Sequence, residues 1–126
     1  MSLIDVGSAN WDSAVLKSPV SVIVDFWAPW CPWCKRLEPE FGSLSNEYAG
    51  RLVFAKVDVE QYPEIAEKYG VQGLPTLKMI CSGRPVGEIV GYLPKDTLRN
   101  QLDLMLSTYD QCLKQSSSLH ASEEPK

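Results

Sequence analysis

The chain has 126 residues and a mass of 14.1 kDa, with 44% hydrophobic and 22% charged residues. These values are typical of one globular domain and exclude a chain that is disordered throughout or collagen-like. A net charge of −4 without a basic stripe disfavours nucleic acid as a partner. The longest apolar run, 20–30, is too short and too polar to span a bilayer, and the first residues lack a signal-peptide pattern. We therefore expect a cytoplasmic protein with no membrane partner.

Secondary structure is predicted from apolar periodicity and from helix-breaking residues. β-Branched residues dominate 20–26, which is typical of a strand covered on both faces, and Asp25 is the one charged residue within it. Pro39 lies inside the longest helical pattern and is expected to kink it, and Gly50 is expected to end it. In chain order, the patterns predict helices over 8–18, 33–49, 63–69 and 95–107 and strands over 3–6, 20–26, 52–59, 76–81 and 85–92.

This order of elements predicts an α/β fold. A strand, a crossover helix and a second strand pair in parallel, and the turn at 82–84 joins the next two strands in an antiparallel hairpin. We therefore expect a central mixed sheet of four to five strands flanked by helices on both faces. The domain is expected to span 1–109. The segment 110–126 is expected to be a polar, disordered tail because it has few apolar residues to pack.

The chemistry of the chain is concentrated in a pair of cysteines, Cys31 and Cys34, at the junction of a predicted strand and a predicted helix. Two cysteines separated by two residues at a helix start can close into a disulfide with little backbone movement. Unpaired amides and the positive end of the helix dipole favour a thiolate at Cys31. We expect Cys31 to be an exposed nucleophile in the first turn, and Cys34, one turn deeper, to be a shielded resolving thiol.

Other interpretations of the cysteines are less favoured. A structural zinc site needs about four ligands, and Cys81, Cys112 and His120 each stand alone in the sequence; an iron–sulfur cluster fails for the same reason. A structural staple is disfavoured because so small a ring removes little entropy from the unfolded chain. A second disulfide between Cys81 and Cys112 is a weaker alternative, because structural disulfides are rare in the cytosol. The pattern favours a redox-active pair and no bound metal.

The sequence around the cysteine pair resembles the active-site signature of thioredoxins, and similar motifs occur along roughly 3–107. They comprise that signature, an approach strand with an acid, a helix-kinking proline, a strand with a lysine, a proline loop and a glycine loop. In the same order they read Trp27-Ala28-Pro29-Trp30-Cys31-Pro32-Trp33-Cys34-Lys35, Val24-Asp25-Phe26-Trp27, Pro39, Ala55-Lys56-Val57-Asp58, Tyr69-Gly70-Val71-Gln72-Gly73-Leu74-Pro75-Thr76-Leu77 and Val90-Gly91-Tyr92. The resemblance implies the thioredoxin fold and a thiol–disulfide oxidoreductase.

The resemblance also implies roles for four catalytic residues. The Cys31 thiolate attacks a disulfide of a client protein, and Cys34 then attacks the sulfur of Cys31 and releases the reduced client. Asp25 is implied to accept the proton of Cys34, because burial raises the pKa of a carboxylic acid towards neutrality. Lys56 resembles the family's lysine near this acid and would oppose that rise.

The same resemblance implies a docking surface for clients. A cis peptide bond is implied before Pro75, in a loop that faces the cysteine pair, and the backbone of Leu74 is implied to pair with the extended client chain. The residues implied to contact the client are Trp30, Trp33, Gly73, Leu74, Pro75, Val90 and Gly91. No cofactor is expected to be bound: electrons come from a separate reductase of the thioredoxin reductase type. The expected partners are this reductase and disulfide-containing client proteins, and we expect a monomer.

The dipeptide between the cysteines, Pro32-Trp33, departs from the Gly-Pro that is usual in thioredoxins. Proline in the first slot looks more like glutaredoxins and periplasmic oxidases of the same superfold. Trp33 restores an amide donor near the sulfur of Cys31, so both residues are candidates for redox tuning, and we expect a pair about 20–40 mV more oxidising than ordinary thioredoxin. The leading function is a thioredoxin-like protein-disulfide reductase. The alternatives are a glutaredoxin-like or isomerase-like oxidoreductase and a non-catalytic binding module.

Overall fold

The computed structural model describes residues 3–109, which form a five-stranded mixed sheet with the strand order β1-β3-β2-β4-β5. The strands are β1 (Leu3–Asp5), β2 (Ser21–Trp27), β3 (Leu52–Asp58), β4 (Thr76–Cys81) and β5 (Arg84–Val90). Strands β1 and β2 both pair with β3 in parallel, whereas β4 is antiparallel to β2 and to β5. The predicted α/β class and mixed sheet are confirmed, and the segment predicted at 3–6 forms the edge strand β1.

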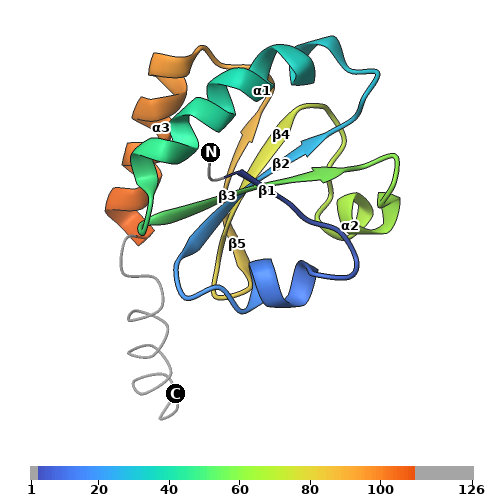
Figure 1. Cartoon of the computed structure of the whole chain (residues 1–126), viewed down its shortest axis with the longest axis horizontal. Coiled ribbons are helices and arrows are strands. Elements are labelled where there is room, and N and C mark those ends of the chain that lie inside the picture. Colours follow the sequence, from blue (N-terminus) through green and yellow to red (C-terminus); the bar gives the residue numbers. More distant parts are fainter. Residues whose placement is uncertain (1–2, 110–126) are drawn as a thin grey trace.

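Helices cover both faces of this sheet (Figure 1). One face carries α1 (Pro32–Ser45), the short 3₁₀ helix η2 (Asn46–Tyr48) and α3 (Lys95–Tyr109), and the other carries η1 (Asp12–Leu16) and α2 (Pro63–Lys68). Successive side chains of β2 and β3 point to opposite faces, so each strand contributes to both apolar layers. Phe54 packs against Phe41 on the first face, and Phe26 packs against Trp11 on the second.

The helix predicted at 8–18 is wrong in extent, since only η1, a five-residue π-helical segment, is formed. The side chain of Asn10 does not cap a helix. Its Oδ1 atom accepts a hydrogen bond from the amide of Gly7, and its Nδ2 atom donates to the carbonyl of Asp5. These bonds hold the segment after β1 as a loop, and Trp11 and Val15 still reach the core as their apolar spacing predicts.

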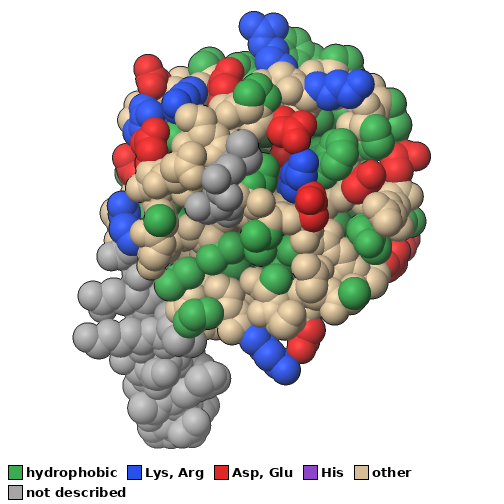
Figure 2. Space-filling model, viewed as in Figure 1, with side chains coloured by type: hydrophobic (Ala, Val, Ile, Leu, Met, Phe, Trp, Pro, Cys, Tyr) green, Lys and Arg blue, Asp and Glu red, His purple; other side chains and the backbone are tan. Residues whose placement is uncertain are grey.

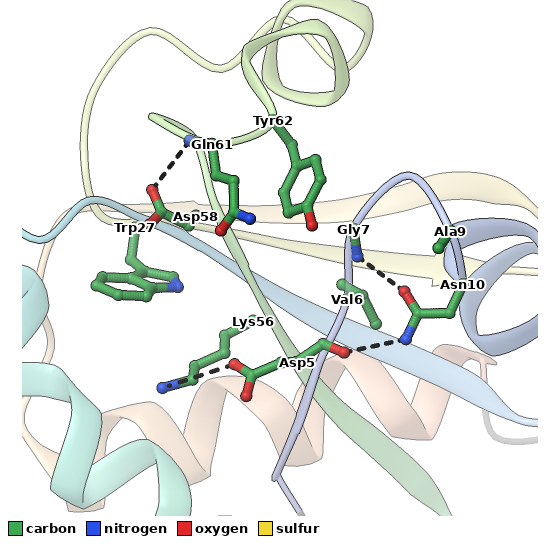
Figure 3. A pocket seen from close by; sticks show the side chains of 10 residues that line it. All are labelled: Asp5, Val6, Gly7, Ala9, Asn10, Trp27, Lys56, Asp58, Gln61 and Tyr62. Carbon is green, nitrogen blue, oxygen red and sulfur yellow. Dashed lines mark hydrogen bonds and ion pairs between the residues drawn. The ribbon is translucent and has the colours of Figure 1, made fainter.

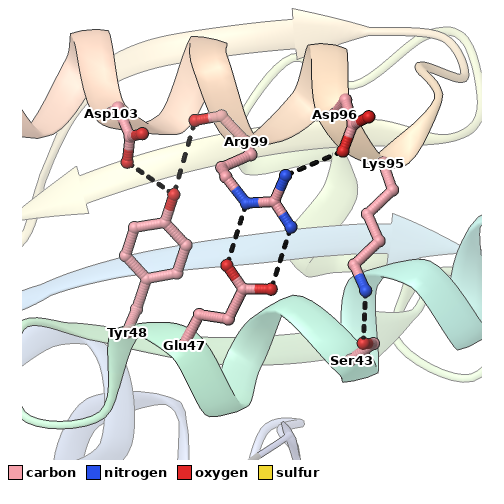
Figure 4. A network of polar contacts seen from close by, with 7 residues as sticks. All are labelled: Ser43, Glu47, Tyr48, Lys95, Asp96, Arg99 and Asp103. Atoms are coloured by element: carbon pink, nitrogen blue, oxygen red, sulfur yellow. Dashed lines mark hydrogen bonds and ion pairs between the residues drawn. The ribbon is translucent and has the colours of Figure 1, made fainter.

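A network of polar contacts ties the end of α1 and η2 to α3 (Figure 4). The guanidinium of Arg99 donates two hydrogen bonds to the carboxylate of Glu47, at 2.9 and 3.0 Å. The hydroxyl of Tyr48 donates to Asp103 at 2.6 Å, and partial burial together with this bond raises the pKa of Tyr48. Lys95 donates to the hydroxyl of Ser43. The network holds α1 and α3 side by side over the sheet.

Positive backbone angles occur where the patterns predict turns. Gly50 has φ +85° just after η2, and Ser82 and Gly83 have φ +52° and +79° in the turn between β4 and β5. Two central residues with positive φ match the twist of a two-residue hairpin, so this turn sets the antiparallel pairing of its strands. Pro39 lies inside α1, where its nitrogen cannot donate to a preceding carbonyl.

The surface carries interspersed acidic and basic side chains on the face drawn in Figure 2, with apolar side chains exposed between them. No helix in the described part of the chain is both long enough and apolar enough to cross a membrane. The segment 110–126, which was predicted to be a disordered tail, lies outside the described residues.

Candidate active site

The cysteine pair lies where β2 leads into α1. Cys31 and Cys34 form a disulfide with a Cα–Cα distance of 5.3 Å. Cys31 is the extended N-cap residue of α1, and its carbonyl accepts the amide hydrogen bond of Lys35. Pro32 occupies the first helical position, where its missing N–H breaks no helical bond. The helix therefore begins directly at the disulfide.

The structure corrects the prediction that Cys31 is exposed. Cys31 is 4% exposed and Cys34 is 2% exposed. Cys31 nevertheless lines a surface pocket of about 290 Å³, together with Trp30, Val59 and Leu74, and Cys34 is not among the residues of that pocket. Side chains from three loops therefore cover the first cysteine. The difference between the two sulfurs is that only Cys31 forms part of the pocket wall.

The hydrogen bond to the sulfur of Cys31 also differs from the prediction. The donor is the amide of Cys34, at 3.2 Å, and within residues 3–109 no such bond comes from Trp33. An N-cap side chain accepts from the second or the third amide that follows it, and here the third is the donor. The amide of Cys34 is present whichever dipeptide separates the cysteines. The predicted extra donor is therefore wrong for the disulfide form.

A loop with a cis peptide bond between Leu74 and Pro75 lies beside the disulfide, as the resemblance implied. The carbonyl of Pro75 accepts from the amide of Gly91 at 2.8 Å, and the hydroxyl of Thr76 donates to the carbonyl of Gly73 at 2.6 Å. These bonds fix both sides of the loop. Within the described residues, the backbone N–H and C=O of Leu74 make no hydrogen bond, so the N–H is free to donate to a client and the C=O to accept from one.

Leu74 separates two apolar hollows. One is the Cys31 pocket, and the other is a pocket of about 310 Å³ lined by Trp33, Leu74, Gly91 and Tyr92. Trp30 is 63% exposed and Trp33 is 52% exposed, and each stands at one of these pockets. Val90 and Gly73 are exposed as well. Four of the residues predicted to contact a client therefore line these two pockets, namely Trp30, Trp33, Leu74 and Gly91, whereas Pro75 is buried.

The two exposed tryptophans are held by residues to which the sequence analysis assigned no role in the site. Trp30 Nε1 donates to Glu60 Oε2 at 2.9 Å. The ring of Trp33 lies 5.5 Å from that of Tyr92, and the guanidinium of Arg36 lies 5.4 Å from the Trp33 ring centroid. Glu60 follows β3 and Tyr92 follows β5, so only the folded chain brings them to the cysteines.

Asp25 is buried on the α1 face of the sheet, with 2% exposure, and its Oδ1 atom has no hydrogen-bond partner among the described residues. Burial raises the pKa of Asp25 from 3.8 to about 7, although the charge of Lys56 opposes the rise and that of Glu38 adds to it. Cys34 precedes the buried Leu37 by one helical turn and so points to the same side of α1. The carboxyl can therefore exchange a proton near neutral pH.

Lys56 is partly buried and belongs to this cluster of charges. Its Nζ atom lies 2.8 Å from Glu38 Oε2, 3.8 Å from Asp5 Oδ1 and 5.1 Å from the centroid of the Trp27 ring. Partial burial lowers the pKa of Lys56, but the hydrogen bond and charge of Glu38 outweigh it, so the pKa is raised. Asp5 and Asp25 add to this effect.

A cleft of about 410 Å³ opens beside these charges, at the ends of β1 and β3 (Figure 3). Lys56, Asp5 and Trp27 form part of its wall. Both polar and apolar side chains line the cleft, and neither cysteine does.

The remaining candidates from the sequence lie apart from this site. Cys81 is buried at the end of β4, as predicted, and is not a free thiol. Cys112 and His120 lie outside the described residues. Within residues 3–109, no group of three or more His, Cys, Asp or Glu side chains could hold a metal ion.

The thioredoxin family model matches residues 2–104 of the chain. The chain is 40% identical over 101 residues to thioredoxin M2, chloroplastic, of Arabidopsis thaliana, which covers 80% of this chain and 54% of that protein. It is 38% identical over 98 residues to thioredoxin 1 of Synechococcus elongatus, with 78% and 92% covered, and 38% identical over 94 residues to thioredoxin of Chlorobaculum thiosulfatiphilum, with 75% and 87% covered.

A disulfide at the start of a helix on this fold defines the class of thiol–disulfide oxidoreductases. The chain belongs to the thioredoxin family, which confirms the resemblance of the motifs. The chain spans little more than half the length of the plant relative described above.

Proposed function

We propose that this chain is a protein-disulfide reductase that works by dithiol–disulfide exchange through Cys31 and Cys34. The observation that carries the proposal is the position of Cys31, which caps the N-terminus of α1 and lines the pocket beside Leu74. Helix N-termini stabilise thiolates, and a pocket gives the thiolate access to a client sulfur. Cys34 lies deeper and serves as the resolving thiol.

The exchange proceeds in two steps. The Cys31 thiolate attacks one sulfur of a client disulfide, the client S–S bond breaks, and the second client sulfur leaves as a thiolate that takes a proton from water. Cys34 then passes its proton to Asp25 and attacks the sulfur of Cys31, which forms the Cys31–Cys34 disulfide and releases the first client sulfur. Two electrons pass from the cysteine pair to the client. Lys56 modulates the proton affinity of Asp25.

Clients dock across the cis-proline loop in this proposal. The backbone of Leu74 pairs with the extended client chain, because its N–H and C=O lie unbonded between two apolar hollows. The apolar rim is formed by Trp30, Trp33, Gly73, Leu74, Val90 and Gly91, and the buried Pro75 provides the cis peptide bond of the loop. Burial of exposed apolar rings against a client supplies the affinity.

We further propose that a separate reductase of the thioredoxin reductase type returns two electrons to the disulfide, and that the chain acts as a monomer without a bound cofactor. We assign it to the cytoplasm. The plant relative is named as chloroplastic, so the plastid is the alternative, and fractionation of the source cells with an antibody to this chain decides between them.

The proposal is tested by insulin reduction with NADPH and thioredoxin reductase, in parallel with glutathione and glutathione reductase. We expect turnover with the first pair. Cys31→Ser should abolish it, whereas Cys34→Ser should accumulate mixed disulfides with clients. Trapping by Cys31→Ser instead of Cys34→Ser would invert the two roles. A biological activity that survives the replacement of both cysteines would favour a binding module.

Pro32 favours one second candidate, a glutaredoxin-like or isomerase-like oxidoreductase with a more oxidising pair. Replacing Pro32-Trp33 by Gly-Pro removes the Trp33 N–H from the first turn of α1 and weakens the positive end of the helix near the sulfur. We expect the double variant to be more reducing than the wild type in a glutathione titration. An equal or higher potential would remove Pro32 and Trp33 from the redox-tuning residues. Faster turnover with glutathione than with thioredoxin reductase would favour this candidate.

A further inference from the structure

Three charged residues form a row across neighbouring strands of the sheet. Asp5 of β1 is in register with Lys56 of β3, and Lys56 is in register with Asp25 of β2. Residues in register on adjacent strands point to the same face, so all three lie on the face that α1 covers. Lys56 therefore stands between two carboxyl groups.

Lys56 is nevertheless engaged by a third acid, which comes from the helix. Its Nζ atom lies 2.8 Å from Glu38 of α1, against 3.8 Å from Asp5, and in the described part of the chain no ion pair joins it to Asp25. The Lys56 side chain is 18% exposed and that of Glu38 is 49% exposed. The ammonium is thus bound towards the solvent side of the row.

We propose that Glu38 is a positioning residue, whose carboxylate holds the Lys56 ammonium away from Asp25 and leaves the buried carboxyl without an ion-pair partner. The inference rests on the proposed role of Asp25 as proton acceptor for Cys34. Glu38 lies four residues after Cys34 on α1, so one helix carries both the resolving thiol and the acid that holds the lysine. Without Glu38, the registered position of Lys56 beside Asp25 favours a direct pair.

Lys56 and Glu38 are the two charged groups in the described part of the chain that shift the pKa of Asp25. Lys56 on β3 lowers the pKa of Asp25, and Glu38 on α1 raises it. On β4 the residue in register with Asp25 is Leu77, which carries no charge, and Cys34 on α1 does not titrate while it is in the disulfide. Asp5 on β1 acts on Lys56.

The test follows the Asp25 carboxyl carbon by NMR as pH is changed, in the oxidised full chain. Glu38→Gln keeps the shape of the side chain but removes its charge, so we expect the Asp25 titration to move down by about one pH unit. Asp5→Asn removes the more distant partner and should give a smaller shift. Glu88→Gln breaks the comparable pair with Lys78 between β4 and β5 and should give none.

Repeating the measurement in the Lys56→Met variant separates positioning of Lys56 from direct repulsion between Glu38 and Asp25. If Glu38 acts through Lys56, most of the shift caused by Glu38→Gln should disappear in Lys56→Met, and Glu38→Asp should restore part of the wild-type titration. The inference is overturned if Glu38→Gln leaves the pH midpoint of the Asp25 titration unchanged. It is also overturned if Glu38→Gln shifts that midpoint equally in the wild-type and Lys56→Met backgrounds. A Cys34 resolving rate that does not follow the measured Asp25 titration overturns the proposed base role instead.

Discussion

Trp30, although mostly exposed, is fixed by a hydrogen bond from its Nε1 atom to the carboxylate of Glu60, at 2.9 Å. Glu60 lies in the turn after β3, where its own amide donates to Asp58 Oδ1 at 2.9 Å. The bond therefore links a side chain of the Cys31 pocket to a turn that is itself hydrogen bonded. It limits the orientations of a large apolar ring before any client binds, which reduces the entropy lost on docking.

Glu60→Ala should free the Trp30 ring and raise the KM for a protein disulfide, by a factor of about two to five, with a smaller change in kcat. The indole N–H of Trp30 should exchange faster with solvent, which NMR measures directly. Glu64→Ala is a matched control, because that exposed acid bonds Ser8 instead of a residue at the Cys31 pocket. Equal KM values for Glu60→Ala and wild type would contradict the role of the bond.

Trp33→Ala should weaken client reduction more than the reduction of a small disulfide. The exposed ring lines the pocket beside Leu74, so its removal takes away apolar surface that only a protein client covers. We expect kcat/KM for insulin to fall by about tenfold, since about 1.4 kcal/mol corresponds to that factor. Leu104→Ala on α3 removes another exposed apolar side chain, away from both pockets, and serves as the control. The docking role fails if the two variants lose insulin reduction equally.

The burial of Asp25 predicts a pH dependence of stability. Between pH 3.8 and about 7 the folded chain keeps a proton that the unfolded chain releases, so the free energy of unfolding falls as pH rises through this window. The full loss is on the order of 4 kcal/mol, at about 1.4 kcal/mol for each pKa unit. Asp25→Asn should lack this fall and be more stable at pH 8.

Urea unfolding at pH 5 and pH 8 measures both effects. Asp12→Asn, which removes an exposed acid paired with Lys17, should retain the wild-type pH dependence. Parallel pH profiles for Asp25→Asn and wild type would show that the carboxyl is already ionised at pH 5 in the folded chain.

Much of the sheet could be predicted because its strands are local apolar patterns. The β-branched run of β2 and the alternation of β3 identify both strands, and Gly50 and Gly83 mark turns that need positive φ. The segment around Asn10 could not be predicted, because its side chain bonds backbone groups of two preceding residues, Asp5 and Gly7, instead of capping a helix. Apolar spacing alone does not show that choice.

The residues of the site likewise fall into those that a local sequence pattern predicts and those that only the folded chain brings together. Cys31 and Cys34 were apparent from their spacing, and Asp25 from its place in an apolar strand. The pair formed by Glu38 and Lys56 depends on how α1 lies over β3, which no local pattern specifies. The burial of Cys31 likewise depends on loops that are distant in the sequence, as does the anchoring of Trp30 by Glu60.

Gly7, in the loop after β1, lies close against the ring of Tyr62, which precedes α2. A Cβ atom added at Gly7 would lie 2.3 Å from Cζ of Tyr62, so the tyrosine ring would have to move. Gly7→Ala should lower the free energy of unfolding by about 1–3 kcal/mol through overpacking. Gly73→Ala, whose Cβ would meet Val90 at an ordinary 3.8 Å, should cost less. Combining Gly7→Ala with Tyr62→Ala should remove most of the penalty; if it does not, the cost has another origin than the ring.

The central place of β2 has a consequence during synthesis of the chain. Its two neighbours, β3 and β4, both follow it in sequence, and the loop that covers Cys31 comes just before β4. A nascent chain that has emerged only as far as Lys68 has both cysteines outside the ribosome but lacks that loop. Its thiols are therefore open to oxidants and to other nascent chains, and they gain the cover of that loop only after Pro75 has emerged from the ribosome.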